Sequence, residues 1–391
     1  MLDLPAIRAR FPALTAITAD GRPVVHADAP GGTQVPQAVI DAMAAYLQAG
    51  NTNAHGAFAR SQETDALCAE VRGKAAAFLG SGADGIVFGP NMTTLTFHLA
   101  DALARTLHAG DHIVCTRLDH DANVSPWLLH AERTGAQIDW VDVDPEHGTL
   151  DLSTLRVDAR TRVIAFPAAS NALGTVVDPR PLVEAARSVG ALTFMDAVHA
   201  APHLPITQRE TGVDVVVCSP YKFFGPHAGI LSADPELLAR LTPSKVRPAP
   251  DSGPERWQTG TAAFEAIAGV GAAIDYLNTV DMTAIGAHEH ALSRRFLDGL
   301  AARPAVNVHG PPTPDGRTPT FAVTVDGHTP DAVAKHMADD GIAVWSGHYY
   351  AVEPMRALDL LDAGGAVRIG FVHYHGPDDV DRVLDALDRL A

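Results

Sequence analysis

One lysine, Lys222, lies in the segment CSPYKFFGPHAGIL, which runs from residue 218 to residue 231. Tyr221 and two phenylalanines flank it, and an apolar run precedes it, so we expect it to be shielded from water. Shielding lowers the pKa of a lysine and leaves its amine nucleophilic, as Schiff-base chemistry requires. A surface lysine whose stem covers apolar neighbours is the more common arrangement for such a segment alone. Whether Lys222 is a Schiff-base lysine or an ordinary surface lysine therefore depends on which other polar groups are expected near it.

The first candidate partner is a phosphate-binding segment. A predicted strand at residues 85–89 leads through a short loop into a predicted helix. The free N–H groups and the dipole of a helix N-terminus favour a phosphate, although an ordinary helix cap explains the same residues. The residues concerned are Asn91, Met92 and Thr93.

Four further predicted strands end beside polar side chains. His120 follows the strand at 112–116, Asn171 follows 162–166, Asp196 ends 192–196, and Ser219 with Lys222 follows 214–218. Each group has an ordinary interpretation, such as a solvated histidine or a turn residue. Ligands of open α/β sheets bind at the carboxyl ends of strands, however, and five such ends supply polar groups. The set fits pyridoxal phosphate, which needs a lysine for its aldehyde, a carboxylate for its ring nitrogen and a phosphate site.

The elements that must position these groups alternate between helices and short apolar strands. This pattern predicts an α/β fold with a mainly parallel, seven-stranded sheet between helices. The predicted helices are 36–50, 61–80, 93–107, 178–190 and 263–277, and the remaining strands of this sheet are 138–143 and 228–233. After residue 265 the pattern predicts a smaller α+β part with strands at 305–309, 320–325, 342–345 and 367–371 and a helix at 379–390. We therefore expect an N-terminal arm (1–22), a large cofactor-binding domain (23–265) and a small C-terminal domain (266–391).

The composition of the chain argues against nucleic-acid-binding, membrane and secreted proteins. The 391 residues carry a formal net charge of -17, which argues against a nucleic-acid or anionic-membrane surface. No apolar stretch approaches the length of a membrane span, and the first residues do not read as a signal peptide. The three cysteines lie far apart, which predicts a reducing, cytoplasmic location without disulfides. We expect a small-molecule enzyme.

Several segments together resemble the class V aminotransferase superfamily, in its cysteine desulfurase and selenocysteine lyase branch. The segment HDANVSPW is similar to the branch's His-x-Ala-Asn-x-x-Pro-Trp, and DAVHAAPHLPI is similar to its Asp-Gly-Ala-Gln-x-x-Pro-His. SNALGTV resembles its asparagine turn, SPYKFFGPHAGIL its lysine segment and ERWQTGT its Arg-x-x-x-Gly-Thr entry to a helix. The resemblance covers nearly the whole chain and implies the type I fold of pyridoxal phosphate enzymes.

The resemblance also implies roles for individual residues. Lys222 would form the Schiff base with the cofactor, Asp196 would hold its pyridine nitrogen, and His120 would stack on its ring. Arg368 would bind the substrate carboxylate through two hydrogen bonds. The remaining implied contacts are Asn171 near the ring hydroxyl, Thr93, Ser219 and the 91–93 backbone at the phosphate, and Thr261 at the phosphate of the neighbouring subunit of a homodimer.

Three departures from the family pattern alter these expectations. His199 stands where the family has a glutamine, so a histidine is expected to face the ring hydroxyl. Tyr221 replaces a phosphate-side histidine. The desulfurases' loop Gly-His-His-Cys reads Gly-His-Tyr-Tyr at residues 347–350, so the persulfide-forming cysteine is absent from this position. Simple packing is an alternative explanation for Tyr350.

These residues predict a carbon-sulfur or carbon-selenium lyase that acts on a cysteine-like amino acid without a persulfide. His348 or Tyr350 would protonate or position the leaving group, and His55 is a further candidate substrate contact. Transamination and epimerisation are alternatives on the same scaffold, as is an inactive, cofactor-bound partner protein. Metal binding by the histidine pairs 199/203 or 373/375 is another interpretation, but neither pair has an evident third ligand, so no metal is expected.

Overall fold

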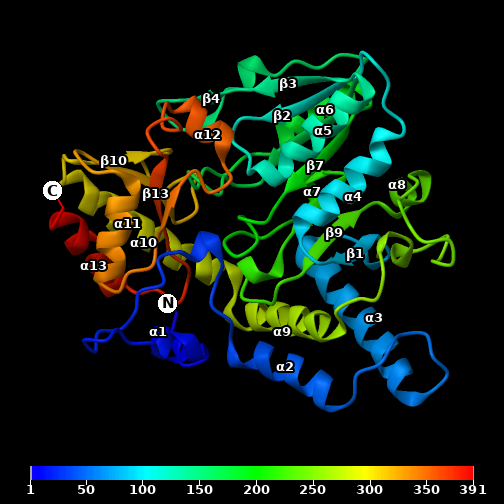
Figure 1. Ribbon diagram of the computed structural model, residues 1–391, viewed down its shortest axis with the longest axis horizontal. Helices are drawn as coiled ribbons and strands as arrows, with labels where there is room; N and C mark the ends of the chain where they lie inside the picture. The colour runs from blue at the N-terminus through cyan, green and yellow to red at the C-terminus, as the bar shows by residue number, and fades with distance from the viewer. Residues whose placement is uncertain (1, 391) are drawn as a thin grey trace.

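The computed structural model describes residues 2–390 and is dominated by a seven-stranded sheet in the order β1-β9-β8-β7-β6-β2-β3 (Figure 1). All neighbouring pairs are parallel except those of β9, which runs antiparallel to both β1 and β8. The carboxyl end of β1 therefore lies at the same edge of the sheet as the carboxyl ends of the parallel strands. The strands are β1 (Ile86–Gly89), β2 (His112–Thr116), β3 (Gln137–Val141), β6 (Thr161–Pro167), β7 (Leu192–Asp196), β8 (Val215–Cys218) and β9 (Gly229–Ala233). This confirms the predicted fold class.

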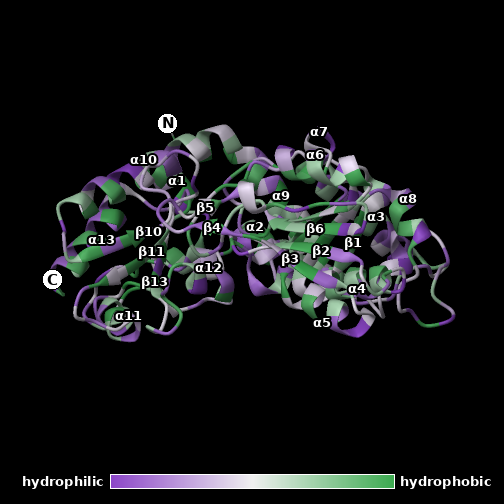
Figure 2. Ribbon diagram, turned by 90° about the horizontal axis from the view of Figure 1, so that it is seen from above, coloured by the Kyte–Doolittle hydropathy of each residue, from purple (hydrophilic) through white to green (hydrophobic). Residues whose placement is uncertain are grey.

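Helices cover both faces of this sheet, as Figure 2 shows from above. Alternate residues of one strand reach opposite cores: Val216 and Cys218 join the cluster of α3, α6 and α9, whereas Val215 and Val217 join that of α4 and α5. This two-sided burial explains why the strands read as continuous apolar runs. The helices of this part are α2 (Gln37–Gln48), α3 (Ala59–Leu79), α4 (Met92–Ala104), α5 (Ser125–Thr134), α6 (Arg180–Val189), α7 (Gln208–Thr211), α8 (Pro235–Arg240) and α9 (Phe264–Val280).

A second, antiparallel sheet has the order β10-β11-β13-β12 and packs against α10, α11 and α13. Its strands are β10 (Val306–His309), β11 (Thr320–Val325), β12 (Trp345–Gly347) and β13 (Ala366–Gly370). Its helices are α10 (Met282–Ala301), α11 (Pro330–Asp339), α12 (Val352–Ala357) and α13 (Pro377–Asp388). Together with the seven-stranded sheet, it gives the α/β plus α+β architecture that the sequence predicts.

Two predicted strands differ from the structure. The strand predicted at 138–143 is β3 only as far as Val141, because the backbone N–H of Asp142 donates to the Thr154 hydroxyl and not to a neighbouring strand. The chain then forms the small hairpin of β4 (Val143–Asp144) and β5 (Thr149–Leu150). The strand predicted at 342–345 begins only at Trp345, because Ile342 is held in an isolated bridge with Val25.

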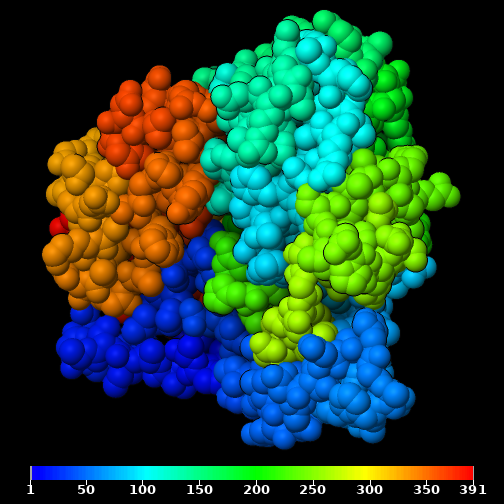
Figure 3. Space-filling view, turned by 45° about the vertical axis from the view of Figure 1, so that its right-hand side comes forward, coloured from blue at the N-terminus to red at the C-terminus, as the bar shows by residue number. Residues whose placement is uncertain are grey.

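The N-terminal arm is tied to the C-terminal part of the chain. In α1 (Leu4–Arg8), the Arg8 guanidinium donates to Asp379 at 2.9 Å. Phe11 is fully buried and meets Phe224, Tyr276 and Tyr374 edge to face. In Figure 3 this blue arm runs along the orange C-terminal residues. The division into segments 1–22, 23–265 and 266–391 stays a prediction.

Candidate active site

Lys222 lies directly after β8, in a short helical turn at Pro220–Lys222, and is followed by the fully buried Phe223 and Phe224. Its ammonium donates to the carbonyl oxygen of Pro30 and lies 4.7 Å from the centre of the Tyr221 ring. Burial and the positive charge of Arg368 together lower the pKa of Lys222 to about 7, and the carboxylates of Asp196 and Asp28 partly oppose that change. The amine is therefore available as a nucleophile or base near neutral pH.

The carboxylate of Asp196 ends the neighbouring strand β7 and is 5% exposed. Its Oδ1 accepts a hydrogen bond from Val198 N at 2.8 Å. Burial raises the pKa of Asp196 to about 6, and the positive charge of Lys222 opposes that rise. A positively charged ring nitrogen beside this carboxylate would lower its pKa again, because opposite charges favour the ionised form.

His120 follows β2 and presents a neutral ring to the same edge of the sheet. Its Nδ1 accepts a hydrogen bond from Ala122 N at 3.0 Å, which places a ring proton on Nε2. Burial lowers the pKa of His120 to about 3, with the charges of Lys222 and Arg368 acting in the same direction. A neutral, flat ring is suited to stacking on an aromatic cofactor.

Arg368 comes from β13 of the second sheet and reaches the loop that carries Asn171. It donates to the carbonyl oxygen of Asn171 at 3.1 Å and lies 4.7 Å from the centre of the Tyr349 ring. Burial lowers the pKa of Arg368 to about 10, so the group stays charged at neutral pH. Within residues 2–390, Arg368 Nε, Asn171 Oδ1 and Asp28 Oδ1 are buried without a hydrogen-bond partner. Such unsatisfied groups are what a bound cofactor and amino acid would use.

The start of α4 carries the predicted phosphate segment. The side chain of Asn91 accepts from Thr94 N at 2.8 Å, so it acts as the helix cap. The backbone N–H of Met92 donates to the Ser219 hydroxyl at 3.0 Å, which joins this helix end to the lysine segment. Thr93 lies in the first turn and is partly exposed. The helix end, its dipole and two hydroxyl groups thus lie together.

His199 follows Asp196 and is 4% exposed. Its Nε2 is 3.0 Å from the Thr318 hydroxyl, and its ring lies 5.3 Å from that of His203 in an edge-to-face arrangement. His203 in turn pairs with Glu289 at 2.8 Å. Among residues 2–390, no group of three or more His, Cys, Asp or Glu side chains is arranged to hold a metal ion.

The loop at residues 347–350 covers the side of the site nearest His120. The Tyr350 ring is stacked beside the His120 ring at 5.7 Å, and Tyr350 O accepts from Asp121 N at 2.6 Å. Tyr350 N donates to His348 Nδ1 at 3.1 Å. Tyr350 is 68% exposed, so much of it lies in contact with solvent.

Two predicted site residues lie apart from this group. His55 is exposed and pairs with Asp65 at 3.0 Å. Thr261 lines a surface cavity of about 420 Å³ together with the 51–53 segment. The chain as described does not bring either residue to Lys222.

Three residues of the site carried little signal in the sequence. Asp28 lies in the loop DAPGG, which a glycine-rich turn explains equally well. Tyr349 lies in the 347–350 loop, which its departure from the family pattern already marks, whereas Thr318 lies in a segment where sequence spacing gives no functional role. Their contacts depend on how the second sheet docks against the first, and no local pattern specifies that.

Comparison with known proteins identifies the family. The family model for class V aminotransferases matches residues 25–383. The chain belongs to the class V aminotransferase family. It is 34% identical to a probable cysteine desulfurase of Mycobacterium leprae, over 99% of this chain and 97% of that protein. It is 33% identical to a probable cysteine desulfurase of Streptomyces coelicolor, over 100% of this chain and 97% of that protein.

Solved structures agree with this assignment. A cysteine desulfurase of Thermococcus onnurineus superposes with a TM-score of 0.92 at 26% identity, covering 100% of this chain and 98% of that one. A cysteine desulfurase of Escherichia coli superposes with a TM-score of 0.88 at 25% identity, covering 100% of this chain and 98% of that one. The chain is therefore a pyridoxal phosphate enzyme of the cysteine desulfurase family. The residues present fit that cofactor, because a lysine with a lowered pKa, a buried carboxylate and a helix N-terminus lie along one edge of the sheet.

Proposed function

We propose that this enzyme is a carbon-sulfur or carbon-selenium lyase that cleaves a cysteine-like amino acid by β-elimination, without a persulfide on the enzyme. The observation that carries the proposal is the loop at 347–350, where Tyr350 lies beside His120 and His348 holds the Tyr350 backbone. In the family pattern the nucleophilic cysteine occupies this position.

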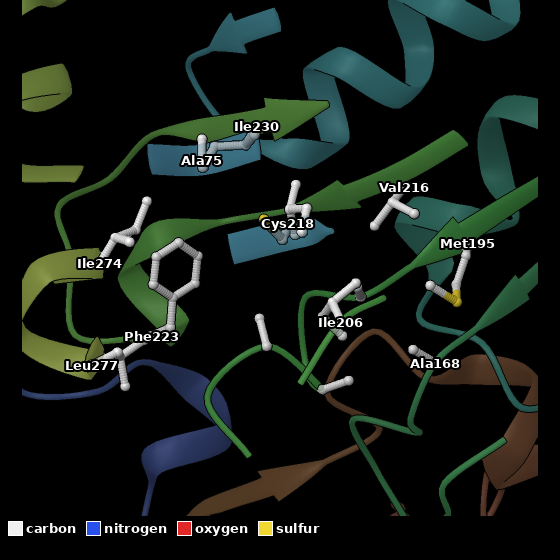
Figure 4. Packing of buried hydrophobic residues seen from close by; sticks show 14 of the residues in the cluster. Ala75, Ala168, Met195, Ile206, Val216, Cys218, Phe223, Ile230, Ile274 and Leu277 are labelled. Carbon is white, nitrogen blue, oxygen red and sulfur yellow. The ribbon is translucent and has the colours of Figure 1, made fainter. Parts of the chain in front are cut away.

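The three cysteines of the chain support this proposal by their positions. Cys115 is fully buried in β2, and Cys218 is fully buried in the apolar cluster of Figure 4. Burial raises the pKa of both thiols, and it raises the pKa of Cys68 on α3 to about 11. A sulfur relay requires an accessible thiolate, and these environments disfavour one.

The chain's own residues account for substrate binding and proton transfer. Pyridoxal phosphate, when bound, supplies an aldehyde for the substrate amine and a ring that withdraws the electron pair left at Cα. Arg368 binds the substrate carboxylate through its planar guanidinium and orients the Cα–H bond. Lys222 Nζ, whose pKa of about 7 leaves a large neutral fraction near neutral pH, accepts the Cα proton.

The Cβ–S bond then breaks, and its electron pair leaves with the sulfur. Tyr350 or His348 donates a proton to the thiolate leaving group. Water hydrolyses the released 2-aminoacrylate to pyruvate and ammonia. The overall reaction consumes one water molecule and yields a thiol, pyruvate and ammonium, with no net oxidation.

We also propose a cytoplasmic homodimer. Thr261 lies apart from Lys222 within one chain, so its family role would require the neighbouring subunit. Exposed apolar side chains on α2 and before α3, such as Ile40, Leu47 and Phe58, are available for such an interface. No helix among residues 2–390 is long and apolar enough to cross a membrane.

The test is turnover of L-cysteine, cysteine sulfinate and L-alanine by the cofactor-loaded enzyme, with pyruvate, ammonia and sulfur products measured together. The lyase proposal expects pyruvate, ammonia and sulfide from L-cysteine and no reaction of alanine. A requirement for a keto acid would indicate transamination, and deuterium uptake with inversion would indicate epimerisation; either overturns the proposal. The variant C68S/C115A/C218A should keep its activity, because the proposed elimination uses no cysteine of the enzyme. If the enzyme carried sulfur as a persulfide on one of these residues, the variant would lose its activity.

A further inference from the structure

The position of His199 is set by a rigid junction between two loops. The backbone N–H of Thr318 donates to Gly174 O at 2.8 Å, and Thr320 N donates to Thr318 O at 2.7 Å. Gly174 has a φ of +77°, and a Cβ there would lie 2.9 Å from Thr318 O. The buried guanidinium of Arg317 donates to the carbonyl oxygens of Leu173 and Thr320. Thr318 therefore has little freedom to move.

The Thr318 hydroxyl has one proton and two polar neighbours. His199 Nε2 lies 3.0 Å from its oxygen, and Gly174 O lies 3.3 Å from it. Both contacts are hydrogen bonds only if the hydroxyl donates to Gly174 O and accepts from His199 Nε2–H. The 3.0 Å separation is the ordinary length of an N–H···O bond. The opposite arrangement uses the hydroxyl for one contact only, which a buried polar group disfavours.

His199 is neutral in this environment and has a single ring proton. Burial holds the pKa of His199 well below its usual range, and the charges of His203, Arg368 and Lys222 act in the same direction. With that proton on Nε2, Nδ1 is left as a hydrogen-bond acceptor. Among residues 2–390, the His199 ring makes its hydrogen bond to Thr318 through Nε2, and no hydrogen bond is made by its Nδ1.

We propose that Thr318 is a positioning residue that fixes the Nε2–H tautomer of His199, so that His199 Nδ1 accepts a hydrogen bond from the cofactor's ring hydroxyl. This rests on the proposed cofactor site. A glutamine, which the family has at this position, can donate its amide N–H to the ring oxygen and stabilise the phenolate. An acceptor nitrogen instead stabilises the protonated hydroxyl. His199 thus shifts the bound cofactor towards its hydroxyl form, and Thr318 determines that shift.

The experiment compares Thr318→Val with Thr320→Val in the holoenzyme. Thr320 is the matched control, because its hydroxyl is fully buried two residues away and has no hydrogen-bond partner within residues 2–390. The readout is the ratio of the near-ultraviolet band of the hydroxyl form to the visible band of the phenolate form. His199→Gln calibrates the phenolate-rich spectrum.

We expect T318V to shift the band ratio towards the phenolate by about fivefold, the factor that corresponds to one net hydrogen bond. T320V should leave the ratio of the wild-type enzyme unchanged. An unchanged ratio in T318V overturns the proposal. An equal shift in both variants also overturns it, because the change would then follow from local packing.

A second measurement separates this inference from the proposed function. Histidine-selective ¹⁵N NMR of the cofactor-free protein reports the tautomer of each ring, and His199 is assigned from the signal that His199→Gln removes. We expect protonated Nε2 and unprotonated Nδ1 at His199. The opposite tautomer overturns the role of Thr318 whether or not the cofactor binds. Failure to bind pyridoxal phosphate, with the expected tautomer present, contradicts the proposed function and leaves the tautomer assignment supported.

Discussion

The strand-end edge of the seven-stranded sheet and the loop at 347–350 contribute to the same site in different ways. At the edge, Lys222 and Asp196 are fixed by burial, and both have shifted pKa values. In the loop, Tyr350 is largely exposed, and Tyr349 and Tyr350 have φ values of 47° and 57°. Non-glycine residues rarely adopt such values, and they cost free energy. The comparison suggests that the edge provides the shared cofactor chemistry and the loop adapts it to a particular leaving group.

The largest expected loss of turnover follows from replacing Lys222 at the strand-end edge of the seven-stranded sheet. Lys222→Ala removes the amine that holds the cofactor and accepts the Cα proton, so we expect turnover to fall by about 10³-fold or more. The visible band of lysine-bound cofactor should disappear in the same variant. Retention of that band in K222A would mean that another residue is the anchor.

Arg368→Lys tests whether the buried guanidinium of Arg368 binds the substrate carboxylate. A lysine keeps the charge but loses the planar pair of donors, so we expect kcat/KM to fall about 30-fold, within the range of a lost charge-assisted hydrogen bond. Because the change affects substrate binding, the cofactor spectrum should stay as in the wild type. A spectrum altered as strongly as the kinetics would indicate that Arg368 acts on the cofactor.

The pH dependence of cofactor capture tests the lowered pKa of Lys222. Only the neutral amine attacks an aldehyde, so the rate of binding to the cofactor-free protein should rise with pH and level off above about 7. Below that pH the rate should fall by about tenfold per pH unit, because the protonated amine is unreactive. Stopped-flow absorbance measures this rate. A rate that keeps rising to pH 10 would show an unshifted lysine.

Tyr350→Phe sharpens the distinction between the edge and the loop. If the hydroxyl protonates the leaving sulfur, turnover of L-cysteine should fall by about 10²-fold, at the low end for a general acid. β-Chloro-L-alanine, whose chloride leaving group needs no proton, should be turned over as before. Equal losses with the two substrates would assign Tyr350 to packing alone.

The smallest effect concerns the loop backbone. Gly347 has a φ of 100° and no atom within 4 Å of an added Cβ, so Gly347→Ala introduces strain without a clash. We expect the free energy of unfolding to fall by about 1 kcal/mol. The matched control is Gly73→Ala inside α3, also without neighbours within 4 Å, which should raise stability by up to about 1 kcal/mol. Thermal or denaturant unfolding of the two variants measures the difference.

The sequence by itself determined the seven-stranded sheet and most of its helices, because apolar strands and amphipathic helices follow local periodicity. It also placed Lys222 and Asp196 at strand ends, where the sheet rule predicts a ligand. The strand boundaries near 142 and 342 were wrong, because long-range partners such as Thr154 and Val25 decide them. Local patterns do not contain such contacts.

Only the tertiary structure decided which groups meet across the two sheets. Arg368 lies 197 residues from Asn171 in the chain, yet it donates to the carbonyl oxygen of that residue, and Thr318 lies 119 residues from His199. The shifts of pKa at Lys222 and Asp196 likewise come from burial by distant segments. Residue types and spacing can specify the chemical groups of a site, but the solvent exclusion and the distances that make those groups reactive arise only when the whole chain packs.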